Sequence, residues 1–228
     1  MEDKPLISHF ALYSFTPDFW DLEGYEKQSQ LTLFLDSVSA AGKAVYCYQV
    51  FPTRSEYDIM IWSADWVESN SSPATFFDQL AGAVNPFRRY VEPIENFWGM
   101  TRPSVYARGK SDQEIDPFKP ERLQYHVIYP FSKTSEWYML GRDTRQGMMN
   151  AHIRIGKTFG EIMQLLVYSF GVQDQEFVVS YEMDDLGKFS DLVNQLRATD
   201  ARIYTLLDTP IITCIYKTKD ELISLFSK

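Results

Sequence analysis

The chain has 228 residues, of which 45% are apolar, and a formal net charge of −9. That length and apolar content suit one or two globular domains with an ordinary core. No apolar run approaches the roughly 18 residues that a membrane helix needs, so we expect no membrane span. The acidic, polar start over residues 1–5 is unlike a secretory signal, which predicts a cytoplasmic protein. The acidic balance and the absence of a basic tract argue against nucleic acid as a partner.

The first half of the chain predicts a regular order of strands and helices from its apolar periodicity and its turn residues. In chain order these are a strand at 6–15, a helix at 28–41, strands at 43–51 and 57–64, a helix at 73–84 and a strand at 95–100. The second half repeats this order about 115 residues later. Its elements are a strand at 123–131, a helix at 142–156, strands at 161–170 and 176–183, a helix at 186–198 and a strand at 209–217.

Both halves therefore follow the β-α-β-β-α-β pattern of a ferredoxin-like unit, an antiparallel sheet with helices on one face. The uncovered face of each sheet needs a partner, and the second copy supplies one. We predict an α+β protein in which two ferredoxin-like repeats form an α+β barrel. Residues 102–122 have the proline, glycine and charge content of a linker. The predicted domains are an N-terminal repeat over 1–110 and a C-terminal repeat over 111–228.

The chain has three histidines, and two of them are expected to be structural or solvated. His9 and His126 lie in the first predicted strand of each repeat, beside apolar positions. His152 lies instead on the predicted helix of the second repeat, one turn after Met149 and one turn before Gly156. A histidine on an apolar helix face beside a glycine suits an axial iron ligand, because the glycine lets a flat macrocycle approach. A porphyrin iron needs one protein ligand, whereas other metal sites need several, and no further ligand accompanies this histidine.

Three short motifs in the second half carry a family resemblance. They are Tyr129-Pro130-Phe131-Ser132-Lys133, Trp137-Tyr138-Met139-Leu140, and Met149-Asn150-Ala151-His152 followed by Gly156-Lys157. In this order they resemble the chlorite dismutase-like haem protein family, most closely its coproheme decarboxylase branch. The similarity runs from about residue 124 to 215. The family fold, two ferredoxin-like repeats with the porphyrin in the second, agrees with the repeat found from the pattern alone.

The resemblance implies a role for each motif residue. His152 would be the proximal iron ligand, with Met149 and Lys157 beside it in the cofactor-binding segment. Tyr129 matches a tyrosine whose radical attacks a porphyrin propionate, and Lys133 matches a lysine beside that propionate. These residue types suit the chemistry, because a tyrosine can give up one electron with one proton, and a lysine can hold a carboxylate.

Further positions match the family more loosely. Gln164 falls above the open face of the iron, where chlorite dismutases have an arginine. Asp200 falls where the family places a carboxylate near the proximal histidine, which would hold the imidazole ring. Arg197 and Arg202 fall near positions that can meet propionates.

Two departures leave the substrate open: Ile153 replaces the glycine that usually follows the histidine, and the basic cluster before the tyrosine strand is weak. The resemblance implies an iron-porphyrin enzyme, with haem b or coproheme bound, that uses hydrogen peroxide to decarboxylate coproheme propionates and give haem b. The alternatives are a haem peroxidase, a chlorite dismutase-type enzyme, a non-enzymatic haem carrier or sensor, and a barrel without iron. The family also predicts a homo-oligomeric ring, commonly a pentamer.

Overall fold

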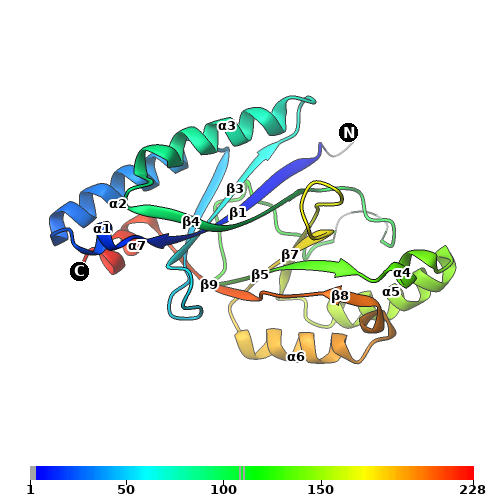
Figure 1. The fold of residues 1–228 in the computed structure, drawn as a ribbon. Coiled ribbons are helices and arrows are strands. Elements are labelled where there is room, and N and C mark those ends of the chain that lie inside the picture. Colours follow the sequence, from blue (N-terminus) through cyan, green and yellow to red (C-terminus); the bar gives the residue numbers. More distant parts are fainter. Residues whose placement is uncertain (1–3, 108, 110) are drawn as a thin grey trace.

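The structure, a computed structural model, describes residues 4–107, 109 and 111–228. The predicted boundary at residue 110 and residues 1–3 of the polar start lie outside the described residues. The strands are β1 (Leu6–Phe15), β2 (Ala44–Gln49), β3 (Ile59–Trp66), β4 (Val91–Met100), β5 (Tyr125–Lys133), β6 (Met163–Tyr168), β7 (Phe177–Met183), β8 (Thr205–Leu207) and β9 (Ile212–Lys217) (Figure 1). The helices are α1 (Pro17–Trp20), α2 (Gly24–Ser39), α3 (Ser72–Val84), α4 (Ser135–Met139), α5 (Arg142–Lys157), α6 (Leu186–Arg197) and α7 (Lys219–Phe226), with 3-10 turns η1 (Asn85–Phe87) and η2 (Asp200–Tyr204).

Eight of the strands close into an antiparallel barrel. The hydrogen-bonded order is β7-β6-β4-β1-β3-β2-β9-β5-β8, and β5 also pairs with β7, which closes the ring. Within the first half the order is β4-β1-β3-β2, and within the second it is β6-β7-β5-β9, so each half has the same ferredoxin-like sheet. The predicted α+β barrel of two repeats is confirmed.

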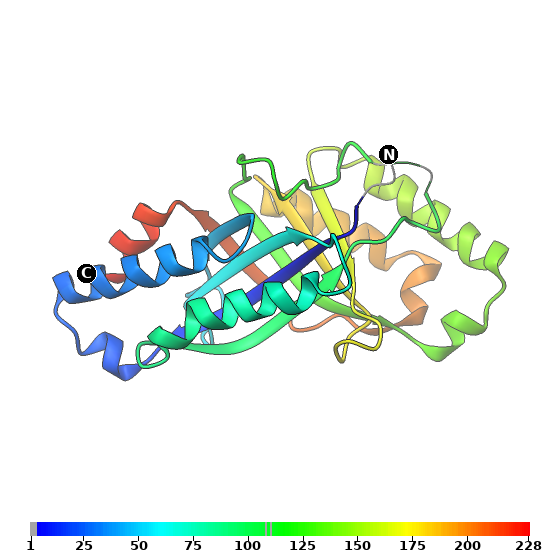
Figure 2. The same ribbon diagram turned by 90° about the horizontal axis from the view of Figure 1, so that it is seen from above.

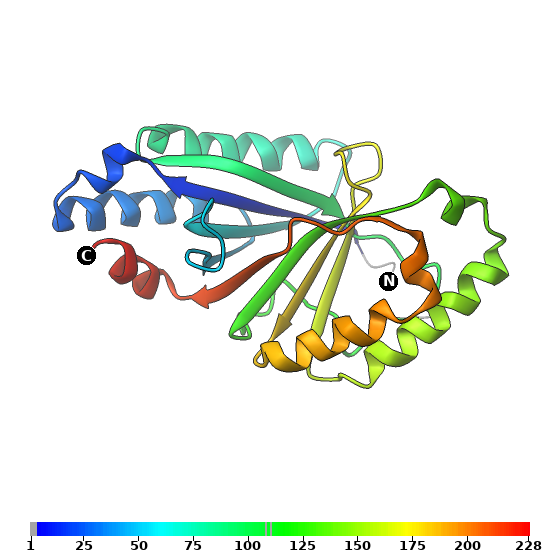
Figure 3. The same cartoon turned by 60° about the horizontal axis from the view of Figure 1, so that its bottom comes forward.

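Strand β1 illustrates why these sequences form a covered sheet. Successive side chains of a strand point to opposite faces. Phe10 and Leu12 point into the barrel, and Ala11 and Tyr13 point out towards the helices. Both sets are buried, so this strand reads as an almost continuous apolar run. Figures 2 and 3 show the helices of the two halves on opposite sides of the barrel.

The two halves are joined along both seams of the barrel. Strand β9 pairs with β2 at one seam, and β4 meets β6 at the other, where Met100 lies opposite Tyr168. Helix α7 packs on α2, and its Leu222 and Phe226 belong to the core of the first half. The end of the chain thus crosses back to the first half, and the division at residue 110 stays a prediction.

Helix α7 was not among the predicted elements, although its sequence contains the signals. Thr218 and Glu221 form a reciprocal capping box at its start, and apolar residues at 222, 223 and 226 share one buried face. The short elements α1, α4 and β8 were also missed, because they span only three to five residues. Strand β4 begins at Val91, earlier than the predicted 95.

The predicted linker is an ordered strap that lies along the barrel. Ile115 is buried in the barrel core, and its N–H donates to the carbonyl of Gln164 on β6. The side chain of Gln113 donates to the carbonyls of Gly156, Phe159 and Ile162, which ties the end of α5 to the start of β6. Over the described part of the chain, no helix is both long and apolar enough to cross a membrane.

Candidate functional site

The layer between sheet and helices is filled very differently in the two halves. In the first half, 21 buried apolar residues pack there among the described residues. The equivalent cluster in the second half contains only six, Val127, Ile162, Tyr181, Met183, Phe189 and Leu192. Since the two halves share one topology, this difference points to the second half as the place where a ligand would complete the core.

Helix α5 shows the same deficit. It has 16 residues, including Met148, Met149, Ile153 and Ile155, yet none of its residues is buried. Its counterpart α2, also of 16 residues, buries Leu31, Phe34, Leu35 and Val38. An amphipathic helix normally buries its apolar stripe. The apolar stripe of α5 is therefore left facing a space that the chain's own side chains do not fill.

The sheet opposite α5 presents a flat, mostly apolar face. Residues directly opposite one another on antiparallel strands point to the same side of the sheet. One row across β5, β7 and β6 is Tyr129, Val179 and Leu166, and all three remain partly exposed. The flanking rows are Val127, Tyr181 and Gln164, and Phe131, Phe177 and Tyr168. A planar ligand would find an even surface here.

His152 lies on the face of α5 that belongs to this space. Burial, and the nearby positive charge of Lys133, lower the pKa of His152 from 6.5 to about 4. The imidazole is therefore neutral at physiological pH, with a nitrogen lone pair free to bind a metal. A Cβ added at Gly156, one turn later, would meet nothing within 4 Å. Met149 is half-buried on the same face, one turn earlier.

Tyr129 is held on the sheet by a second tyrosine. Its hydroxyl donates a hydrogen bond to Tyr181, and the two rings stack with centroids 6.2 Å apart. Burial raises the pKa of Tyr129 well above its usual value, and the Tyr181 contact adds to this. Tyr129 therefore remains a protonated phenol. Tyr181 itself packs against Phe189 of α6, which fixes the pair from behind.

Lys133 lies at the end of β5, beside this pair and near His152. Its ammonium donates to the carbonyl of Ala201 at 2.9 Å and lies 4.5 Å from the ring centroid of Trp137. Burial, together with the charge of Arg202, lowers the pKa of Lys133 from 10.5 to about 8. The side chain is thus a positioned cation that loses its proton more readily than a surface lysine.

The structure brings Arg197 and Arg202 together through a shared acid. Both guanidinium groups bind Asp208, at 3.2 and 2.6 Å respectively. The charges of Asp208 and Arg197 both act on the pKa of Tyr129, which places this trio beside the tyrosine pair. Asp208 follows the short strand β8, and nothing in its sequence surroundings singled it out.

Three predicted residues lie at the edges of the site. The exposed Gln164 sits in register beside Tyr181, and its backbone binds the strap at Gln113. Asp200 is exposed at the start of η2, and no bond joins it to His152 within the described residues. Lys157 is exposed in the last turn of α5, where its charge complements the helix dipole.

Comparison with known proteins then places the chain. The chlorite dismutase family model matches residues 25–217, which is most of the sequence. The chain belongs to the chlorite dismutase family. Among curated members, a coproheme decarboxylase of Mycolicibacterium smegmatis is 29% identical over 167 residues, covering 73% of this chain and 70% of that protein. A coproheme decarboxylase of Staphylococcus saprophyticus is 30% identical over 164 residues, covering 64% of this chain and 62% of that protein.

Solved structures of the chlorite dismutase family share the fold over nearly the whole chain. The chlorite dismutase of Candidatus Nitrospira defluvii, solved in complex with imidazole, gives a TM-score of 0.82 at 18% identity, covering 98% of this chain and 95% of that one. An arginine-to-lysine mutant of the same enzyme gives 0.83 at 19% identity, covering 99% and 97%. The predicted family resemblance is confirmed.

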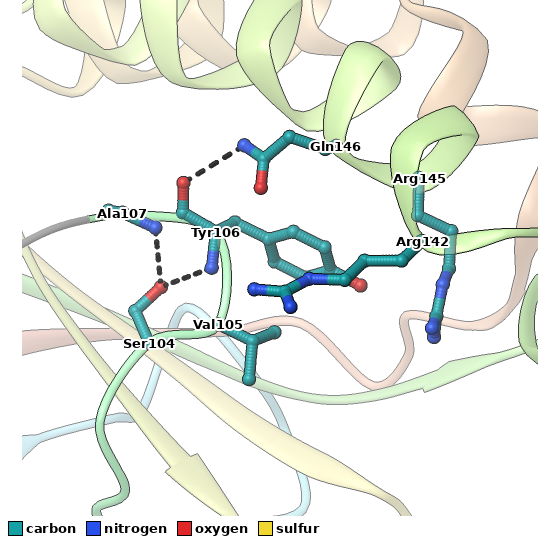
Figure 4. A pocket seen from close by; sticks show the side chains of 7 residues that line it. All are labelled: Ser104, Val105, Tyr106, Ala107, Arg142, Arg145 and Gln146. Carbon is teal, nitrogen blue, oxygen red and sulfur yellow. Dashed lines mark hydrogen bonds between the residues drawn. The ribbon is translucent and has the colours of Figure 1, made fainter.

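This member of the chlorite dismutase family also has an open hollow of about 770 Å³ at the start of α5 (Figure 4). Its lining residues are Ser104, Val105, Tyr106, Ala107, Arg142, Arg145 and Gln146. His152 is not among them, but it lies two turns further along the same helix. None of the lining residues was predicted, because linker residues and arginines at a helix start usually face solvent.

Proposed function

We propose that this chain binds an iron porphyrin between α5 and the sheet of its second half, with His152 as the iron ligand. The observation that supports this most is that α5 buries none of its residues while facing a flat sheet row. The site suits such a group in two further ways: a Cβ at Gly156 would meet open space, and Nε of Arg145 is buried without a partner. No group of three or more His, Cys, Asp or Glu side chains is placed to hold a different metal ion in the described ranges.

We further propose that the bound porphyrin is coproheme and that the reaction is peroxide-dependent decarboxylation of its propionates. With peroxide, the iron would supply the oxidising power. Each propionate gives up carbon dioxide, a proton and two electrons as it becomes a vinyl group, and one peroxide takes those electrons to form two waters. Curated relatives at 28–30% identity are named coproheme decarboxylases, which supports this choice.

The chain's own residues would have distinct tasks in this reaction. Tyr129 would lose an electron and its phenol proton together, because its raised pKa keeps the hydroxyl protonated. Lys133, with a pKa near 8, would hold the reacting carboxylate and exchange a proton with it. The sheet row and α5 would exclude water from the reacting edge.

Adding iron coproporphyrin III and peroxide to the purified protein, and following products by mass spectrometry, tests the proposal. Products that have lost one and then two carboxyl groups are expected. Binding with oxidation of an added phenol, but without carboxyl loss, would favour a peroxidase, and binding without turnover would favour a carrier. The family resemblance also predicts a cytoplasmic ring of five copies, which sedimentation analysis tests.

A further inference from the structure

A strap of the linker crosses the start of α5 and encloses the hollow described above. The hydroxyl of Ser104 accepts the N–H groups of Tyr106 and Ala107 at 3.2 and 3.1 Å, which bends the strap into a turn. The side-chain amide of Gln146 donates to the Tyr106 carbonyl at 3.0 Å and fastens the turn to the helix (Figure 4). The hollow is therefore bounded by ordered groups on both sides.

Two arginines of α5 line this hollow without a carboxylate partner. Within the described part of the chain, neither Arg142 nor Arg145 is in an ion pair. Nε of Arg145 is buried and has no hydrogen-bond partner at all. A buried guanidinium N–H without an acceptor is costly, so its presence indicates an acceptor that arrives from outside the chain. Arg142 is exposed at the rim.

The arginines stand in a fixed relation to His152. At 100° and 1.5 Å per residue, Arg145 falls within about 20° of His152 around the helix and about 10 Å nearer its start. A flat ligand held by His152 with its plane along α5 extends one edge towards Arg145. The helix start adds its own preference for negative charge at that edge.

We infer that this hollow is a carboxylate-binding subsite for one acidic edge of the porphyrin, with Arg145 as the main contact and Arg142 as the outer one. This inference rests on the proposed function. The basic cluster expected before the tyrosine strand is weak in this chain. The subsite moves the cationic partners to α5 and closes them under the strap, and it selects porphyrins that carry carboxylates on that edge.

The test compares three single substitutions on one helix: Arg145→Gln, Arg142→Gln and, as the control, Arg154→Gln. Arg154 is exposed and lies on the opposite side of α5 from His152. Each apoprotein is titrated with iron coproporphyrin III and with its tetramethyl ester, and the Soret band reports binding. Circular dichroism confirms that each variant is folded.

For the acidic porphyrin, Arg145→Gln should raise Kd by roughly 10- to 100-fold, the range for a lost hydrogen bond to a charged group. Arg142→Gln should raise it by less than about fivefold, because exposed charges are screened. Arg154→Gln should leave it unchanged. The tetramethyl ester should bind all variants and the parent with equal Kd, because it has no charged edge.

Equal Kd values for Arg145→Gln and Arg154→Gln with the acidic porphyrin would overturn the subsite while leaving the proposed function standing. An equal weakening of the ester and the acid by Arg145→Gln would also overturn it, since the effect would then not depend on the carboxylates. If the parent protein binds neither porphyrin, the proposed function and the subsite both fail.

Discussion

Removing one hydroxyl from Tyr129 should separate binding from turnover. The Tyr129→Phe variant keeps the ring that stacks on Tyr181 at 6.2 Å, so packing should be largely preserved. It loses the hydrogen bond that Tyr129 donates to Tyr181. One such bond stabilises a fold by about 0.5–1.5 kcal/mol. For a chain of this size that corresponds to a drop in Tm of roughly 2–6 °C.

Tyr181→Phe is the matched control, because it removes the other hydroxyl of the same hydrogen bond. Both variants should lose similar stability, and both should bind iron coproporphyrin III within about tenfold of the parent. Their turnover should differ. Phenylalanine at 129 has no O–H to give up with an electron, so decarboxylation should fall by at least about 100-fold, the lower end of what a proton-transferring group contributes. At 181 the same change leaves the reacting phenol in place.

The assay is the yield of decarboxylated porphyrin per unit time after peroxide is added to each loaded variant, with Tm measured in parallel. A large rate effect with a small binding effect marks a residue that takes part in the reaction. Equal turnover of Tyr129→Phe and Tyr181→Phe would contradict the radical role of Tyr129, whatever their stabilities.

Three further outcomes are expected. His152→Gly should abolish the Soret spectrum of the ferric complex, and added imidazole should restore it; an unchanged spectrum in the variant would rule out iron ligation. Chlorite should be decomposed far more slowly than by enzymes near the diffusional ceiling, because Gln164 stands where those enzymes have arginine; rapid oxygen release, followed with an oxygen electrode, would contradict this. Burial lowers the pKa of His126 to about 3 and of His9 to about 4, so the unfolded chain takes up protons below 6.5 that the folded chain does not. The apoprotein should thus have full stability from these groups above pH 6.5 and lose up to about 1.4 kcal/mol per pH unit for each histidine on acidification towards 4. Urea unfolding at several pH values measures this slope, and an equal slope in His126→Gln would refute it.

The fold could be predicted from the sequence because each strand and long helix has its own apolar periodicity, and because the order occurs twice. The site was predictable where a motif names the residue, as for His152 and Tyr129. Asp208, Tyr181 and Arg145 could not be found in this way. Asp208 acts through two arginines distant from it in the contact pattern, and Tyr181 looks like any strand tyrosine. Arg145 is indistinguishable by sequence from a solvated charge at a helix start.

Closure of the barrel also limits how copies of this chain can meet. A sheet with open edges can extend by pairing its backbone with another chain, whereas a closed ring has no such edge. Of the described strands, β8 lies outside the ring, and it is only three residues long. Association by strand addition is therefore confined to that short segment, and any larger assembly depends on the fit of helix and loop side chains. Surface substitutions can then alter assembly without interrupting the hydrogen bonds of the barrel.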